Sequence, residues 1–442
     1  MNSNKKNIFY EKIIEKVSRK DYKIGIIGMG YVGLPLALAF CKKDIVTLGF
    51  DINENIINSL KNCVSYINHI KSNEIKKYVS NNKLIPSENL ESINKVDVII
   101  ICVPTPLNKN KEPDLNFIKN SLDSIKNFLH KGQILILEST TYPGTTEEIL
   151  KPFIEKKGLK VGKDFFLVYS PEREDPGNKK YQTHNIPKII GGCTKNCASI
   201  AKSIYSQITE EIIVLSSTRA AEMTKLVENI HRAVNIGLVN ELKIIAEELG
   251  VDLYEVIKAA ATKPFGFMPF FPGPGLGGHC IPIDPYYLTW KAKEFGIHTK
   301  FIELAEEINS SMPKHVVSKI SNSLNDICKS IKKSSILILG IAYKKNIDDA
   351  RESPSLEIID LLLKMGANIK YNDPYFPKFP KFRKYNYVID SIELTSENLE
   401  LFDCAVLLTD HDCYDYELIR VNSKLIIDTR GKYNNSSNII RA

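Results

Sequence analysis

The chain has 442 residues, of which 43% are hydrophobic and 25% are charged, a balance typical of a soluble globular protein with two or three domains. Lys and Arg number 59 against 52 Asp and Glu, so the formal net charge is +7. The lysines are dispersed along the chain, which suits an anionic ligand without identifying it. The lack of a basic-aromatic motif argues against a nucleic-acid partner.

The cysteine content and the first residues of the chain bear on the cellular compartment of the protein. There are nine cysteines, an odd number spread over a long chain, and this usage favours a reducing environment over a disulfide framework. Cys193 and Cys197 lack a second ligand pair at metal-binding spacing, so no metal site is predicted. Residues 1–20 are polar and contain neither the apolar core nor the cleavage site of an export signal. We therefore predict a cytoplasmic protein.

The first strong pattern is a strand, a glycine-rich turn and a helix over residues 22–40. The turn carries Gly28, Gly30 and Gly33, and Asp51 follows a second apolar run, 18 residues after Gly33. This is the dinucleotide fingerprint in its required context, because the glycines let a pyrophosphate approach the helix N-terminus and the acid binds the ribose hydroxyls. A carboxylate would repel a 2′-phosphate, so NAD is predicted rather than NADP.

The same region also needs to be considered as a membrane segment. Residues 24–41 carry no charge and reach the length at which a spanning helix becomes a candidate. Four glycines and Pro35 lie within them, and the strand–turn–helix pattern explains this segment better than a membrane span. No membrane partner is predicted.

Strand-like apolar runs then alternate with helical segments, as in a doubly wound parallel sheet; they cover residues 96–103, 133–137 and 165–169. Thr105 follows the first of these runs and Thr140 follows the second. Ligands of open α/β sheets bind beyond the carboxyl ends of the strands, so both threonines are candidate cofactor contacts. Ordinary turn chemistry explains each of them equally well.

Residues 218–250 form a nearly glycine-free amphipathic stretch, which predicts one helix about 50 Å long. A helix of this length indicates a central connection between domains that also supports dimerisation. Glu222, Lys225 and Asn229 are spaced i, i+3 and i+7, so they share one face. A solvated charged face is the alternative explanation.

The next segment places a cysteine in a loop rich in Gly and Pro. Eleven of the 22 residues from 264 to 285 are Gly or Pro, which excludes a helix or central strand and predicts close approach of the backbone to another group. Cys280 lies in this loop, and Asp284 follows four residues later. Cys280 is therefore a candidate nucleophile, with a small buried hydrophobe as the alternative.

After a predicted helix over residues 301–328, an α/β pattern begins again without a second glycine fingerprint. Five strands are predicted, at 335–340, 367–371, 387–389, 404–409 and 424–428. The predicted fold class is α/β, with two Rossmann-like doubly wound domains joined by a long central helix. The predicted parts are a polar segment (1–20), an NAD-binding domain (21–215), a central helical dimerisation region with the cysteine loop (216–330) and a C-terminal Rossmann-like domain (331–442).

Six motifs, in this order, make the chain resemble the UDP-glucose/GDP-mannose dehydrogenase family over nearly its whole length. Among the branches it is most similar to the bacterial UDP-N-acetylglucosamine 6-dehydrogenases of surface-polysaccharide synthesis, mainly through residues 263–275 and 281–290. The motifs are GMGYVGLP (28–35), VPTP (103–106), SPER (170–173), KLVEN (225–229), GGHC (277–280) with Asp284, and GIAYK (340–344) leading to DARES (349–353).

The resemblance implies that residues 331–442 bind a UDP-sugar and that two NAD⁺ oxidise its C6 hydroxyl to a carboxylate. Cys280 would trap the aldehyde as a thiohemiacetal and then carry the product as a thioester, which suits a thiolate because it both adds to carbonyls and leaves again. Lys225 would stabilise the oxyanions, and Asn229 would hold the same oxygen or a water. Asp284 would orient water or move protons, and Glu172 would lie near the sugar and the hydrolytic water.

The expected contacts follow from the same motifs. The expected catalytic residues are Cys280, Lys225, Asp284, Asn229 and Glu172. The expected cofactor contacts are Gly28, Gly30, Tyr31, Val32, Gly33, Asp51, Pro104, Thr105, Thr140 and Arg351. The expected substrate contacts are Glu172, Lys225, Asn229, Phe270, Gly277 and Lys344, and the expected assembly is a homodimer.

Two positions depart from the family pattern and leave alternatives open. UDP-glucose enzymes often carry a second acid where this chain has Pro176. The residue that acts as the base in thioester hydrolysis is therefore not assigned. His279 stands where some relatives have Ser. It either lowers the pKa of the Cys280 thiol or has a structural role in packing the loop. UDP-N-acetylmannosamine and UDP-glucose stay open as substrates. A non-catalytic nucleotide-sugar binding protein and a two-electron dehydrogenase or epimerase are alternatives of other classes, but neither explains Lys225, Cys280 and Asp284 together.

Overall fold

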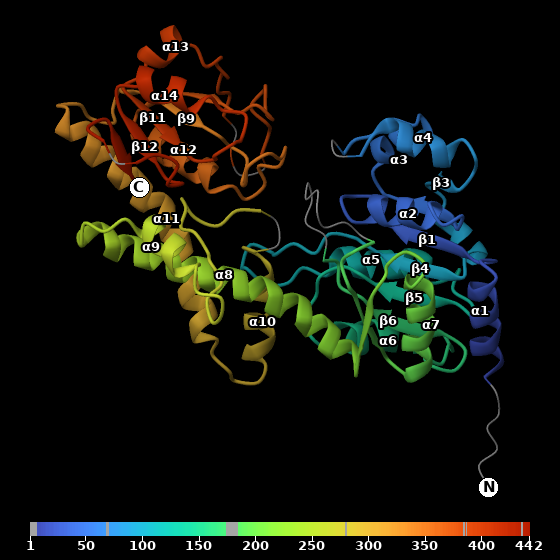
Figure 1. Cartoon of the computed structure of the whole chain (residues 1–442). Helices are drawn as coiled ribbons and strands as arrows, with labels where there is room; N and C mark the ends of the chain where they lie inside the picture. The colour runs from blue at the N-terminus through green and yellow to red at the C-terminus, as the bar shows by residue number, and fades with distance from the viewer. Residues whose placement is uncertain are drawn as a thin grey trace. The chain divides into compact units, whose positions relative to one another are not determined.

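The computed structural model describes residues 7–67, 70–173, 184–278, 281–382, 385, 387–434 and 436–442. The chain divides into two compact units. The first contains Met1–Glu228 and Tyr286–Ile297, and the second contains Asn229–Pro285 and His298–Ala442. Each unit is built around its own β-sheet, and helix α8 (Thr218–Glu248) contributes residues to both units (Figure 1).

The first unit contains a sheet of eight strands in the order β3-β2-β1-β4-β5-β6-β7-β8. Neighbouring strands are parallel except β6 and β7, which pair antiparallel through Val168 and Tyr169. The predicted parallel sheet is therefore confirmed for β1 to β6, whereas β7 reverses the direction. The strands are β1 (Lys23–Ile27), β2 (Val46–Phe50), β3 (Leu84–Ser87), β4 (Val98–Ile101), β5 (Ile134–Leu137), β6 (Phe166–Tyr169), β7 (Lys188–Gly192) and β8 (Ile212–Leu215).

The central strands of this sheet are continuous apolar runs because both of their faces are covered. Every residue of β4, β5 and β6 is buried, as expected for strands between two layers. One face packs against side chains of α1, α2 and α7. The helices of the unit are α1 (Ile8–Ser18), α2 (Gly33–Cys41), α3 (Glu54–Lys61), α4 (Ser72–Val79), η1 (Leu90–Lys95), α5 (Asn116–Ile125), η2 (Thr146–Leu150), α6 (Lys151–Glu155) and α7 (Lys195–Tyr205), with α10 (Asp284–Lys293) mostly in this unit.

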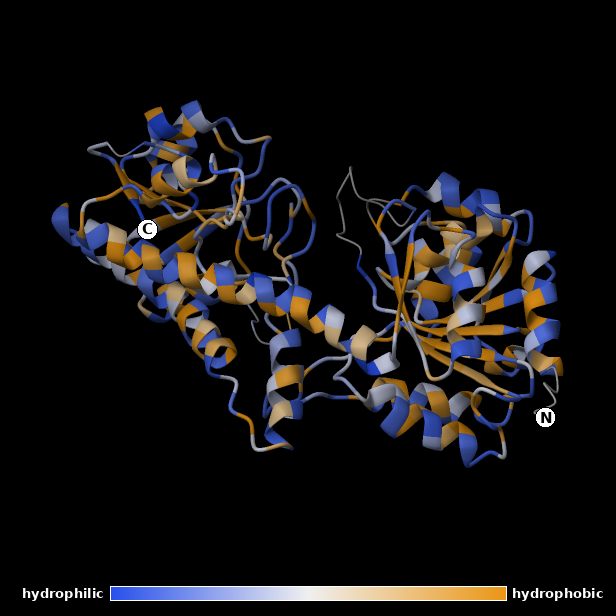
Figure 2. Ribbon diagram, turned by 60° about the horizontal axis from the view of Figure 1, so that its bottom comes forward, coloured by the Kyte–Doolittle hydropathy of each residue, from blue (hydrophilic) through white to orange (hydrophobic). Residues whose placement is uncertain are grey.

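The second unit contains a parallel sheet of five strands in the order β10-β9-β11-β12-β13. Alternate residues of β9 and β11 point to opposite faces, so one core forms under α11 and α12 and another under α13 and α14. The strands of both sheets are mostly apolar (Figure 2). The elements are α9 (Leu253–Ala260), α11 (Lys300–Asp326), β9 (Ser335–Leu339), α12 (Pro354–Lys364), β10 (Asn368–Asn372), α13 (Ser396–Glu400), β11 (Cys404–Leu407), α14 (Tyr416–Asn422), β12 (Ile426–Asp428) and β13 (Ile439–Arg441).

One predicted strand is wrong. Residues 387–389 form no strand, and the fifth strand of the second sheet is instead β13. Val388 is 97% exposed, whereas Ile389 is buried in the core and Tyr387 packs against it, so the run contacts the core without pairing as a strand. Only a single bridge joins the neighbouring Ser391 to Tyr371 of β10.

The long helices were predicted more accurately. Helix α8 has 31 residues and α11 has 27, close to the predicted ranges. Within the described parts of the chain, neither of them nor any other helix has the length and apolar composition needed to cross a membrane.

Candidate active site

The glycine-rich turn after β1 leaves open space where a dinucleotide would approach. A Cβ on Gly28 would lie 2.7 Å from the carbonyl oxygen of Cys102, and one on Gly33 would lie 1.9 Å from the carbonyl oxygen of Gly28. These two glycines are therefore required by the turn itself. A Cβ on Gly30 would meet no atom of the described chain within 4 Å. Gly30 is thus the position that borders free space, as a bound pyrophosphate requires.

Asp51 lies at the carboxyl end of β2 and is held by the same turn. Its carboxylate accepts the backbone N–H of Met29 at 2.8 Å and that of Asn53 at 2.9 Å. Tyr31 and Val32 complete the turn and lead into α2, whose N-terminus is capped by none of the described side chains. A half-buried carboxylate and an uncapped helix N-terminus fit the ribose and the pyrophosphate of NAD.

The loops after β4 and β5 lie next to each other, because their strands are neighbours in the sheet. The hydroxyl of Ser139 donates to the carbonyl oxygen of Val103 at 2.7 Å and joins the loops. Thr105 is buried and its carbonyl oxygen accepts the hydroxyl of Tyr287 at 2.9 Å, whereas Pro104 is exposed. Thr140 is half-buried in the second loop. Both loops lie beyond the carboxyl ends of the strands, as the cofactor expectation requires.

Glu222 is a residue of this region that the sequence analysis did not assign. Its buried carboxylate accepts the N–H of Gly144 at 2.6 Å, the N–H of Thr146 at 2.8 Å and the hydroxyl of Thr146 at 2.7 Å. Burial raises its pKa from 4.5 to about 7, although these donors lower it in part. Glu222 therefore ties α8 to the loop that contains Thr140. The signal available in the sequence was the position of Glu222 on the same helix face as Lys225 and Asn229.

Lys225 and Glu172, both candidate catalytic residues, are in contact. The ammonium of Lys225 donates to the backbone carbonyl oxygen of Glu172 at 2.5 Å. Glu222, Lys225 and Asn229 are all buried. The alternative that they form a solvated face is therefore wrong.

In the second unit, Asn229 and Asp284 are also in contact. The side-chain amide of Asn229 donates to the carboxylate of Asp284, and its oxygen accepts a hydrogen bond from Arg232. Asp284 is buried at the first turn of α10. The structure therefore brings four of the five candidate catalytic residues together as two pairs. The fifth, Cys280, lies outside the described residues, as do His279 and Pro176.

The glycines before Cys280 make the close approach that the sequence predicted, and their neighbour is the chain itself. A Cβ on Gly277 would lie 2.7 Å from the Cβ of Tyr343, and one on Gly278 would lie 2.9 Å from the ring of Tyr343. Gly278 also has a φ of +91° and donates its N–H to the carbonyl oxygen of Arg351 at 3.2 Å. This packing connects the cysteine loop to the segment after β9.

Buried amides hold the start of this loop. The side-chain oxygen of Asn240 accepts the N–H of Gly273 at 3.0 Å, and its amide donates to Asn309 at 2.9 Å. The hydroxyl of Tyr254 lies 3.2 Å from the carbonyl oxygen of Pro272. The sequence analysis assigned none of these anchors, because their partners are distant in sequence.

The remaining predicted contacts in the second unit lie on loops. Arg351 is exposed and makes a two-pronged ion pair with Asp349, with Nη2 at 2.6 Å from the carboxylate. Lys344 is half-buried after β9. Phe270 is half-buried with its ring edge-on to His231, the centroids being 5.7 Å apart.

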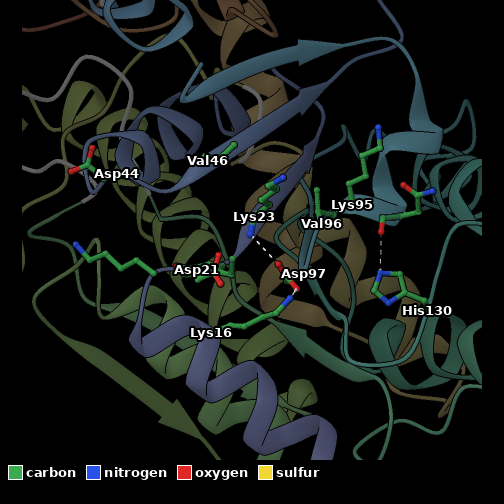
Figure 3. Close-up of a pocket in the computed structure, with 12 residues that line it drawn as sticks. Lys16, Asp21, Lys23, Asp44, Val46, Lys95, Val96, Asp97 and His130 are labelled. Carbon is green, nitrogen blue, oxygen red and sulfur yellow. Dashed lines mark hydrogen bonds and ion pairs between the residues drawn. The ribbon is translucent and has the colours of Figure 1, made fainter. Parts of the chain in front are cut away.

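One cavity of the first unit has a different location. It measures about 350 Å³ and lies at the amino ends of β1, β2 and β4, where Lys23, Val46 and Asp97 line it (Figure 3). The fingerprint glycines and Asp51 follow the carboxyl ends of the same strands. The cavity is therefore at the opposite edge of the sheet and is no part of the candidate site.

Comparison with known proteins agrees with this geometry. Three domain descriptions of the UDP-glucose/GDP-mannose dehydrogenase family match the chain: the NAD binding domain over residues 22–209, the central domain over 219–311 and the UDP binding domain over 337–435. A UDP-N-acetyl-D-glucosamine 6-dehydrogenase from Pseudomonas aeruginosa is 39% identical over 358 residues, covering 80% of this chain and 83% of that protein.

Two archaeal proteins are similar over an even larger share of the chain. A UDP-N-acetyl-D-mannosamine dehydrogenase from Methanocaldococcus jannaschii is 36% identical over 426 residues, covering 93% of each chain. A solved structure of a UDP-D-ManNAc dehydrogenase from Pyrococcus horikoshii superimposes with a TM-score of 0.85 at 31% identity, covering 95% of this chain and 98% of that one. The chain belongs to the UDP-glucose/GDP-mannose dehydrogenase family, and it is an oxidoreductase that uses NAD.

The three glycines of the turn should respond differently to substitution. Gly30→Ala should fold normally, because its Cβ enters open space, and should weaken NAD binding at least about tenfold by blocking the pyrophosphate. Gly33→Ala should lose stability, because its Cβ would overlap the Gly28 carbonyl oxygen. Calorimetric titration with NAD and thermal unfolding check both outcomes. Wild-type NAD affinity in Gly30→Ala would show that the cofactor does not approach this turn.

Glu222 should make stability depend on pH. Its pKa is about 7 in the folded chain against 4.5 ordinarily, so the folded state loses stability as pH rises through this window, by about 3 kcal/mol in total. The glutamine of Glu222→Gln does not titrate, and it has one side-chain oxygen to accept hydrogen bonds where Glu222 has two. The free energy of unfolding should therefore differ most between wild type and variant near pH 5, and the gap should narrow towards pH 8. A constant gap in chemical denaturation across this range would contradict the assignment, since the neighbouring Arg219–Glu147 ion pair is present in both proteins.

Proposed function

We propose that the protein oxidises the C6 hydroxyl of UDP-N-acetyl-D-glucosamine to the uronate in two two-electron steps, for surface-polysaccharide synthesis in the cytoplasm. The observation that carries the proposal is the pairing of buried polar residues along α8. Lys225 contacts the Glu172 loop, and Asn229, four residues later, contacts Asp284. A buried ammonium and a buried amide–carboxylate pair are groups that stabilise and move charge during oxidation of an alcohol.

The net reaction consumes one alcohol, two NAD⁺ and one water, and yields one carboxylate, two NADH and three protons. Bound NAD accepts a hydride in each of the two oxidations. After the first, the Cys280 thiolate adds to the C6 aldehyde and gives a thiohemiacetal. The second oxidation leaves a thioester, and attack of water on its carbonyl carbon releases the carboxylate and returns the thiolate.

Each paired residue has a role in this scheme. Lys225 stabilises the oxygen that becomes negative in the tetrahedral species, an effect of about 3 to 4 kcal/mol for a fixed donor. Asn229 holds the same oxygen or a water, and Asp284 orients water or transfers a proton. Glu172 lies beside Lys225 and assists the hydrolytic water. Arg351 contacts the NAD, and Lys344 contacts the anionic nucleotide.

The aromatic segment before the cysteine loop supports an N-acetylated sugar. Phe265 is 70% exposed and Phe267 is 41% exposed, so these rings are not buried as scaffold within their unit. They are available to contact the methyl of a 2-acetamido group, which would contribute about 1 to 3 kcal/mol. Phe270 differs, since it packs on His231. Because relatives are named for both N-acetylglucosamine and N-acetylmannosamine substrates, UDP-N-acetyl-D-mannosamine is the second candidate.

We also propose that the protein is a homodimer. Leu238, Leu242, Ile245 and Leu249 recur at helical spacing on α8 and just after it, and all four are exposed in the single chain. An exposed apolar stripe of this kind costs free energy in water. A second copy offers the same stripe, and two such stripes can pack against each other around a twofold axis.

Counting NADH tests the reaction. With UDP-N-acetylglucosamine, UDP-N-acetylmannosamine and UDP-glucose supplied separately, the first should give the highest kcat/KM and two NADH per sugar. The rate of uronate production should fall by at least about 100-fold in Cys280→Ser, because the ester that replaces the thioester would have to release an alkoxide, which is a poor leaving group. One NADH per sugar in the wild type, or full uronate production by the variant, would contradict the covalent scheme.

Charge on the α8 stripe tests the dimer. Leu238→Glu combined with Ile245→Glu should convert the dimer to a monomer, because burying two carboxylates per chain is unfavourable. Light scattering after size exclusion measures the mass. Leu401→Glu, at an exposed leucine of α13's end, is the matched control and should leave the mass unchanged. A wild-type mass of one chain would refute the proposal.

A further inference from the structure

A buried lysine that none of the preceding roles uses lies between two carboxylates. Lys188 is the first residue of β7 and is 8% exposed. Its Nζ lies 2.8 Å from one carboxylate oxygen of Glu138, at the end of β5, and 3.8 Å from the carboxylate of Glu172. Burial alone would lower the pKa of Lys188, but the two carboxylates outweigh this effect and raise it. The ammonium is therefore charged in the folded protein.

Glu138 is arranged to hold the lysine from one side. Its second carboxylate oxygen accepts the hydroxyl of Tyr205, which is buried at the end of α7. The ring of Tyr205 also lies 5.1 Å from Lys188 Nζ. Both oxygens of Glu138 thus have partners on different elements, and Lys188 has little freedom to turn away from Glu172.

Glu172 receives positive charge from two directions. Lys225 donates to its backbone carbonyl oxygen, while Lys188 faces its side chain. Its side chain is mostly buried, with 15% exposure. One oxygen of the Glu172 carboxylate accepts the backbone N–H of Arg173 at 2.6 Å, and the other oxygen is the one that faces Lys188. Without Lys188, the carboxylates of Glu138 and Glu172 would lose the ammonium that both of them face, and like charges at short range repel strongly in a buried site.

We propose that Lys188, held by Glu138 and Tyr205, is a positioning residue that keeps the Glu172 carboxylate in place for hydrolysis of the thioester. The inference rests on the proposed function, because it assigns Lys188 to one step of that reaction. The distance of 3.8 Å is beyond a hydrogen bond, so Lys188 acts on Glu172 through charge. If Lys188 served only to stabilise the fold, its contact with Glu138 would matter and its contact with Glu172 would not.

Two variants separate these roles. Glu138→Gln with Lys188→Met replaces the buried ion pair by neutral groups of similar size, a change that often leaves stability nearly intact. It removes the charge that faces Glu172. Glu138→Gln alone keeps that charge. Lys202→Met, at an exposed lysine of α7, is the matched control for the Lys-to-Met change.

The experiment compares the initial burst of NADH with the steady rate of turnover, which shows which step of the reaction has slowed. The double variant should keep the first burst of NADH and a KM within about twofold, while steady turnover falls on the order of 100-fold. The acyl-enzyme should then accumulate and appear in acid-quenched samples as added mass on the peptide that contains Cys280. Glu138→Gln alone removes a carboxylate that holds Lys188, so its turnover should fall between those of the wild type and the double variant.

The outcomes are decisive in both directions. Wild-type turnover in a folded double variant, or an equal loss of burst and steady rate, would overturn the positioning role. So would an acyl-enzyme that accumulates in Lys188→Arg, which keeps a cation facing Glu172, and this variant decides the matter if the double variant does not fold. The wild type is assayed first, and its failure to form two NADH per UDP-sugar would refute the proposed function rather than the role of Lys188.

Discussion

Helix α8 carries polar side chains that are buried, and an unpartnered buried polar group costs about 1 to 3 kcal/mol, so each of them must meet a group from another element. Glu222 meets the loop after β5, and Lys225 meets the loop after β6. Asn229 meets the start of α10, and Asn240 meets the start of the cysteine loop. Helix α8 thus holds the loops that bear Thr140 and Glu172 in the first unit, and Asp284 and the start of the cysteine loop in the second.

This arrangement explains why the polar residues lie on a regular helix rather than on a loop. A helix fixes the spacing of its side chains, so residues three or four apart are presented in one direction. Lys225 and Asn229 have this spacing. The chemistry proposed for them requires groups held within a fraction of an ångström, and rigid elements provide this better than mobile segments do.

The buried charges of the first unit also require partners. Lys188 is retained in the interior because carboxylates surround it, and Glu138 is retained because Lys188 and Tyr205 satisfy it. Such a cluster is costly to assemble and adds little net stability compared with apolar packing. Its cost is consistent with a role beyond folding, which is the basis for assigning Lys188 to Glu172.

Local sequence determined the elements whose physical requirements are local. The turn at Gly28, Gly30 and Gly33 needs glycine at defined positions, and the apolar periodicity of residues 218–250 specifies a helix, so both were predicted within a few residues. Tertiary structure decided what depends on partners distant in the chain. It reversed β7, left residues 387–389 outside the sheet and placed Glu222 and Lys188 against their partners, because burial and charge pairing are properties of the packed chain.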